Sequence, residues 1–108
     1  MSRSCLALAL VLMLLAAAVP ATAQDVGSAA QGARLAAEVC AACHATGAGD
    51  FTSPDPDAPP FSAVAEDPAI GRTALLVWFR SPHPSMPMLR LSATEEHDLI
   101  AYFLSLKE

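Results

Sequence analysis

The chain has 108 residues, with 11 acidic residues against 6 Lys and Arg and a formal net charge of −5 at pH 7. This acidity argues against nucleic acid as a partner, because phosphate binding requires a basic surface. The length suits one domain with a small core, a size at which proteins usually rely on disulfides, a metal or a cofactor.

Residues 1–23 have the pattern of a cleaved secretory signal. Arg3 precedes an unbroken apolar run, residues 6–19, and the small residues of Ala21-Thr22-Ala23 follow at the cleavage position. The run is shorter than the about 20 residues that a membrane-spanning helix needs. We therefore predict an exported, periplasmic protein with one domain, residues 24–108, and no membrane span in the mature form. An uncleaved N-terminal anchor is the alternative.

Cleavage would remove Cys5 and leave two cysteines, Cys40 and Cys43. In an oxidising compartment, structural disulfides normally join cysteines that are far apart in sequence. A bridge between residues three apart closes almost no loop and stabilises little. We therefore expect these cysteines to have a chemical role rather than to form a stabilising disulfide.

The first predicted helix runs from Gly27 to Cys43. Alanine is abundant there, and apolar residues recur at three- and four-residue spacing. Ser28 is the expected N-cap. Such a helix would place Cys40 and Cys43 on one face. Residues 45–60 are rich in Pro, Gly and Asp and predict a long loop, which is functional or disordered in most compact domains.

A second helix is predicted over residues 70–80, with Thr73 as a candidate cap and Leu75, Leu76 and Phe79 facing inward. The prolines of residues 81–87 end it.

The third predicted helix begins at a capping box, Ser92 to Glu95. Its inward side chains are Leu99, Tyr102, Phe103 and Leu106. No segment alternates with period two, so we expect an all-α fold without strands.

The pentad Cys40-Ala41-Ala42-Cys43-His44 has three chemical interpretations. A structural zinc site needs four ligands, and the other histidines, His83 and His97, lie far apart. A thioredoxin-like redox pair belongs at a strand-to-helix turn, which this helical pattern lacks. Covalent haem attachment, with both thiols on vinyl groups and His44 on the iron, fits best. We predict one covalently attached haem c.

The other ring nitrogen of a metal-bound histidine needs an acceptor that fixes its tautomer and basicity. The stretch Ala58-Pro59-Pro60-Phe61 offers carbonyls that are held stiffly by the proline rings. We expect the Pro59 carbonyl to accept from His44, with Pro60 as second choice. The alternative is that both prolines only stiffen the loop.

Met86 is the expected ligand on the other face of the iron. Pro87 holds it in an extended conformation, and Met/His ligation suits electron transfer. The other candidates are Met88, His97 and His83, of which His83 would give a bis-histidine site of lower potential. Gap-filling in the core is the ordinary use of a methionine such as Met86.

Three features in this order resemble the class I monohaem c-type cytochromes over residues 28–107: the CAACH pentad, the Met86-Pro87 pair and the closing segment DLIAY, residues 98–102. The resemblance implies three main helices wrapped around one covalent haem, with His44 and Met86 on the iron. It also implies a close crossing of the first and last helices at Gly32, against Leu99 and Tyr102.

Trp78, Arg80 and Arg90 are further candidates for contact with the haem. Trp78 would donate its indole N–H to a propionate or cover the ring. The two arginines would neutralise propionates, with solvent exposure as the alternative.

These features predict a periplasmic electron-transfer protein that is not an enzyme and binds redox partner proteins transiently, as a monomer. The loop after His44 is acidic, whereas the family's better-known members have a lysine-rich face, so we expect partners with a basic docking face. The rivals are a haem subunit of a larger oxidoreductase and a gas-binding haem sensor.

Overall fold

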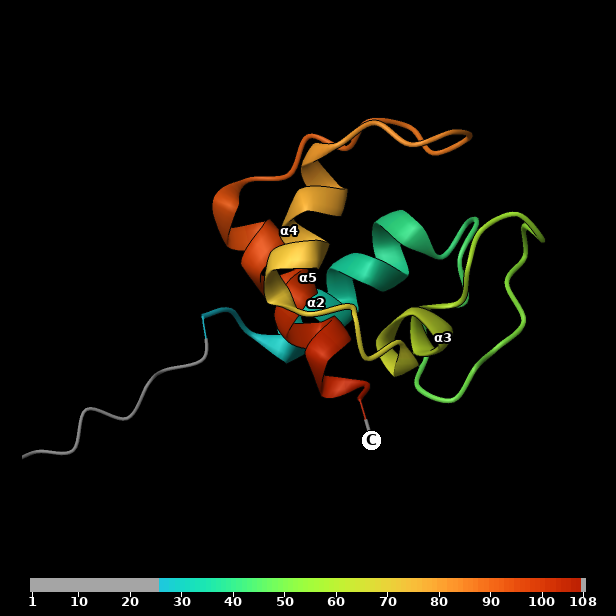
Figure 1. Ribbon diagram of the computed structural model, residues 1–108, viewed down its shortest axis with the longest axis horizontal. Coiled ribbons are helices and arrows are strands. Elements are labelled where there is room, and N and C mark those ends of the chain that lie inside the picture. Colours follow the sequence, from blue (N-terminus) through green and yellow to red (C-terminus); the bar gives the residue numbers. More distant parts are fainter. Residues whose placement is uncertain (1–25, 108) are drawn as a thin grey trace, which may run out of the picture.

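The computed structural model describes residues 26–107. In this part the chain forms helices and no strands, which confirms the all-α prediction (Figure 1). The elements are α2 (Ala29–Leu35), the π-helix η1 (Ala36–Cys40), α3 (Phe61–Glu66), α4 (Arg72–Arg80) and α5 (Ala93–Ser105). None of these helices combines the length and the apolar character needed to cross a bilayer. The predicted signal, residues 1–23, lies outside the described residues and stays a prediction.

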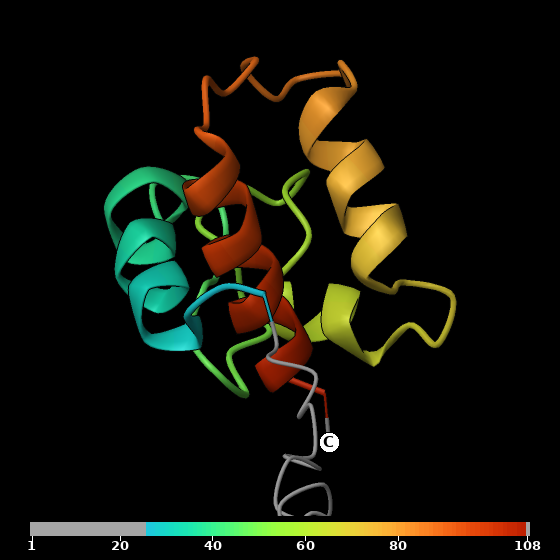
Figure 2. The same cartoon turned by 90° about the vertical axis from the view of Figure 1, so that its left-hand side faces the viewer.

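Helix α5 is the centre of the arrangement. Figure 2 shows α2 and η1 on one side of it and α4 on the other, with α3 near its C-terminal end. Phe61 of α3 stacks on Phe103 of α5 with ring centroids 4.1 Å apart. The buried core draws on η1, α3, α4 and α5, at Ala36, Cys40, Phe61, Leu75, Leu99, Ile100 and Phe103, and the half-buried Leu35 of α2 packs against it. Burying a Leu, Ile or Phe side chain of this kind contributes about 1.5–3 kcal/mol.

The first predicted helix is correct in its start and wrong in its end. Ser28 caps α2, where its Oγ accepts from the backbone N–H of Gln31 at 3.3 Å. After Leu35 the backbone widens into η1, in which the Ala41 N–H donates to the Ala36 carbonyl at 3.0 Å. The helix ends at Cys40 instead of Cys43. Apolar spacing over a single turn does not distinguish an α-helix from a π-turn, so the sequence carried no signal for this change.

The other elements follow the sequence more closely. The capping box of α5 is present: Ser92 Oγ accepts from the Glu95 N–H, and the Glu95 carboxylate accepts from the Ser92 N–H at 2.7 Å. Helix α4 starts after Gly71, so Thr73 is not its cap. Helix α3 was not predicted, because six residues are too few to show a period. The segment 45–60 forms no regular helix or strand, as expected.

Helices α2 and α5 cross at Gly32, which confirms the predicted close approach. A β-carbon built on Gly32 would lie 2.8 Å from Tyr102 Cβ and closer still to the Asp98 carbonyl oxygen. Next to this crossing Leu99 is fully buried. Gly27 adds a second close approach, because a β-carbon built on it would clash with the His97 carbonyl, and its φ of +102° also favours glycine. The crossing fixes the helix that leads to the cysteines against α5, which follows the loop of residues 81–92 that contains Met86.

Replacing Gly32 by Ala should therefore lower the free energy of unfolding, even though alanine favours helix formation. The new methyl group can avoid the Asp98 carbonyl only if two helix backbones move apart, and overpacking of this kind costs about 1–3 kcal/mol. Urea denaturation followed by circular dichroism measures it. Gly47→Ala is the matched control, because its new β-carbon meets nothing nearer than Asp50 Cβ at 3.9 Å. Equal stability of the two variants would contradict this account of the crossing.

Candidate functional site

The pentad begins at Cys40, the last residue of η1, and continues into a turn. The N–H groups of Cys43 and His44 both donate to the Cys40 carbonyl, at 3.1 and 2.9 Å. The predicted shared helix face of the two thiols is thus replaced by a turn. Cys40 is buried, Cys43 is exposed, and both are free thiols. Burial raises the pKa of the Cys40 thiol to about 11, so it is protonated at neutral pH.

His44 has one ring nitrogen committed to the backbone. Its Nδ1 lies 2.7 Å from the carbonyl oxygen of Pro59, which is the acceptor predicted as first choice from the sequence. Since a carbonyl can only accept, Nδ1 carries the proton and Nε2 keeps its lone pair. The Pro60 carbonyl, the second choice, instead accepts from the Val64 N–H in the first turn of α3. The ring is also tilted against Phe61, with centroids 5.4 Å apart.

The loop of residues 45–60 is held against the pentad by hydrogen bonds. The Asp55 N–H donates to the Cys43 carbonyl at 3.0 Å, and the Phe61 N–H donates to the Ala45 carbonyl at 2.9 Å. The Tyr102 hydroxyl of α5 donates to the carbonyl of Thr46, and burial raises the pKa of that phenol. The loop is therefore ordered, and it delivers Pro59 to His44.

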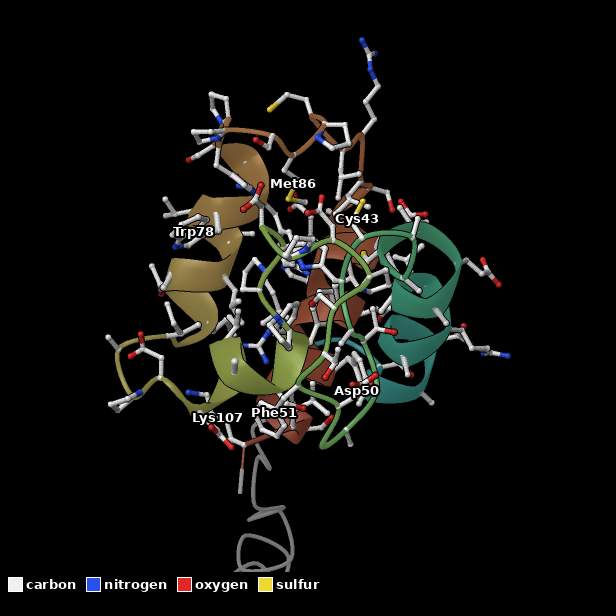
Figure 3. All side chains as sticks on the ribbon, turned by 90° about the vertical axis from the view of Figure 1, so that its right-hand side faces the viewer. Cys43, Asp50, Phe51, Trp78, Met86 and Lys107 are labelled. Atoms are coloured by element: carbon white, nitrogen blue, oxygen red, sulfur yellow. The ribbon has the colours of Figure 1, made fainter. Side chains whose placement is uncertain are left out.

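Met86 lies in the loop of residues 81–92, which connects α4 to α5. Figure 3 shows its side chain at the same end of the molecule as Cys43. In Figure 1 the turn after η1 lies between this loop, drawn in orange, and the green loop that carries Pro59. Met86 is half-buried, whereas Met88 is 60% exposed. The structure therefore brings Met86, rather than Met88, inward at the end of the molecule where the pentad lies.

His83 contacts Met86 directly. Its Nε2 lies 2.6 Å from Met86 Sδ, and its Nδ1 lies 3.1 Å from the Ser81 carbonyl oxygen. Trp78 packs edge-on against the His83 ring, with centroids 5.2 Å apart, and is itself 53% exposed. His97 lies on α5, outside this group.

Arg80 and Glu96 form an ion pair that sequence reasoning missed. The Arg80 guanidinium donates to both Glu96 carboxylate oxygens, with contacts of 2.7 and 3.1 Å. The hydrogen bond from Arg80 is the main cause of a lowered pKa of Glu96, whose side chain is buried. Arg80 ends α4 and Glu96 lies in the first turn of α5, so the pair ties both ends of the Met86 loop together.

The expectation for Arg80 as a cation for propionates stays a prediction, because the pair engages only its Nε and one terminal nitrogen and leaves the side chain 57% exposed. Arg90 is exposed within the loop, where the expectation for it stays a prediction. A sequence signal for the pair did exist: Glu96 precedes the buried Leu99 and Ile100 by three and four residues, so it lies on the buried stripe of α5. A carboxylate on such a stripe needs a partner.

The residues present fit covalent haem attachment. Two unpaired thiols and a histidine with its Nε2 lone pair available come from one turn. A structural zinc site would need four ligands, and within residues 26–107 no three His, Cys, Asp or Glu side chains gather as metal ligands. Large apolar side chains near Met86 in sequence, at Val77, Trp78 and Met88, are exposed to solvent. A large apolar cofactor beside this loop would cover surface of this kind.

Replacing Glu96 by Gln should lower the free energy of unfolding at neutral pH. It should also make that free energy fall less as the pH is lowered. A lowered pKa means that the ionised pair stabilises the fold above 4.5, the ordinary value, and that this contribution is lost as pH falls through the folded-state value. Urea midpoints at pH 7 and at pH below 4 measure both effects. Glu66→Gln, an exposed change on α3, is the control. A variant as acid-sensitive as the parent would contradict this role of Glu96.

Comparison with known proteins gives one informative match. Cytochrome c-552 of Bradyrhizobium diazoefficiens is 38% identical to the chain over 98 residues, which cover 91% of this chain and 90% of that protein. No protein-family model matches the chain. No solved structure matches it either.

Proposed function

The chain belongs to the monohaem c-type cytochromes, and from this premise we propose that it is a periplasmic carrier of single electrons with His/Met axial ligation. Like its family it carries one covalently bound haem c and is an electron carrier rather than an enzyme. The haem, when bound, supplies an iron that takes up and releases one electron. The chain's own residues hold it, exclude water and tune its potential.

The observation that carries the proposal is the hydrogen bond from His44 to Pro59. Because Nδ1–H donates to the carbonyl, the lone pair of Nε2 remains for the iron, and the ring cannot change tautomer without breaking the contact. A carbonyl acceptor of this kind raises the basicity of the ligating nitrogen and orients the ring. Cys40 and Cys43 lie in the same turn and would bind the two vinyl groups.

Met86 is the proposed ligand on the opposite side. Its loop is tied at both ends by Arg80 and Glu96, and it contains prolines that restrict the backbone. A thioether held in this way is placed to bind the iron, and Met/His ligation raises the reduction potential. Trp78 would shield the haem on the same side through its contact with His83.

Replacing Met86 by Ala should abolish the charge-transfer absorption of a sulfur-ligated ferric haem and lower the reduction potential. Met88→Ala should leave both unchanged, because Met88 is 60% exposed. Visible spectroscopy and a potentiometric titration of the purified holoproteins measure this. Intact mass of the same samples checks that each carries one haem and lacks residues 1–23. A Met86→Ala spectrum equal to that of the parent would remove Met86 from the iron.

The acidic chain should bind redox partners that have a basic docking face. Charge steers such encounters, which are small and transient. Electron-transfer rates with a basic partner should therefore fall as ionic strength rises and the Debye length drops to about 10 Å at 0.1 M. Stopped-flow kinetics over a salt series test this, with an acidic partner as the control. Rates that do not respond to salt would contradict the proposed basic face.

A further inference from the structure

The Met86 loop contains a second donor atom beside the proposed ligand. His83 precedes Met86 by three residues, and its Nε2 lies 2.6 Å from Met86 Sδ. The ring is half-buried, held on its other side by the Ser81 carbonyl at 3.1 Å and packed against the edge of Trp78. Pro82 and Pro84 flank it and limit the backbone.

The contact brings together two atoms, His83 Nε2 and Met86 Sδ, that can each offer a lone pair. The Ser81 carbonyl oxygen and Met86 Sδ can both only accept, and a neutral imidazole has one N–H to donate. The carbonyl is the stronger acceptor, so we assign the proton to Nδ1 and the lone pair to Nε2. A thioether sulfur likewise has only lone pairs to offer. In this tautomer neither Nε2 nor Sδ donates to the other, so the contact is not a hydrogen bond. Imidazole nitrogen and thioether sulfur are, however, both iron ligands in haem proteins.

We propose that His83 is a second, exchangeable distal ligand: when the Met86 sulfur leaves the iron, Nε2 of His83 binds in its place. This rests on the proposed function and adds a second ligation state to it. In the exchange an Fe–S bond breaks and an Fe–N bond forms, and no proton has to move because Nε2 already has its lone pair. No oxidant or reductant is required.

The loop is built so that the exchange needs only local movement. The Arg80–Glu96 pair holds both loop ends whichever residue is bound. The other candidate donors are placed differently, since Met88 is 60% exposed and His97 lies within α5 rather than in the loop. The exchange lowers the reduction potential, because a histidine replaces a methionine. One protein would thereby have a high-potential and a low-potential form.

The test compares four ferric holoproteins: the Met86→Ala variant, the Met86→Ala/His83→Ala double variant, the matched Met86→Ala/His97→Ala double variant and His83→Ala alone. Electron paramagnetic resonance reports spin state and ligand type. We expect bis-histidine low-spin iron in Met86→Ala and in the His97 control. The His83 double variant should be high-spin, bind carbon monoxide readily when reduced, and become low-spin on addition of free imidazole. His83→Ala alone should keep the sulfur-ligated spectrum.

The outcomes separate this inference from the function on which it rests. High-spin iron in Met86→Ala, in a protein whose parent shows sulfur ligation, would overturn the exchange alone. A parent-like spectrum in Met86→Ala, or loss of the parent spectrum in His83→Ala, would overturn the Met86 assignment and the exchange with it. If the alanine variant does not accumulate, Met86→Leu keeps the apolar volume and is compared with its His83→Ala double in the same way.

Discussion

The hydrogen bond between His44 and the Pro59 carbonyl is the contact on which the rest of the site depends. It joins the turn that carries both thiols to the far end of a loop of proline, glycine and aspartate, and it decides which ring nitrogen is free. The helix crossing at Gly32 places this turn beside the core, and Phe61, stacked on Phe103, supports the ring. Helix, loop and core thus together fix the orientation of the His44 imidazole.

The two sides of the site are built differently. The pentad side is bound to the 45–60 loop and to α5 by backbone contacts at Cys43, Ala45 and Thr46. The Met86 side is a loop fixed mainly at its ends, by the ion pair of Arg80 and Glu96. A rigid proximal side suits a permanent attachment. A loop fixed at its ends can change which side chain it presents, and this difference is the physical basis of the proposed ligand exchange.

Much of the fold was predictable because it rests on local chemistry. The caps at Ser28 and Ser92, the loop over residues 45–60 and the close approach at Gly32 each follow from residue types or from the family resemblance. The Pro59 acceptor could be predicted because a metal-bound imidazole requires a hydrogen-bond acceptor for its second nitrogen.

The remaining features depend on contacts that no local pattern encodes. The π-turn of η1 and the six-residue α3 are too short to show a period. The position of Glu96 on the buried stripe signals that it needs a partner, but the choice of Arg80, 16 residues away, depends on how α4 packs on α5. Likewise the contact between His83 and Met86 depends on the path of a proline-rich loop, including a positive φ of 66° at Ser85. The sequence showed which donors exist, and the structure showed which of them meet.

The most direct test of the account is the protonation of His44 in the reduced, diamagnetic holoprotein. Nuclear magnetic resonance of protein labelled with ¹⁵N in its histidines resolves the two ring nitrogens. The account predicts a slowly exchanging proton on Nδ1 of His44, coupled through the hydrogen bond to the Pro59 carbonyl, and no proton on Nε2. A proton on Nε2, or an Nδ1 without one, would contradict it.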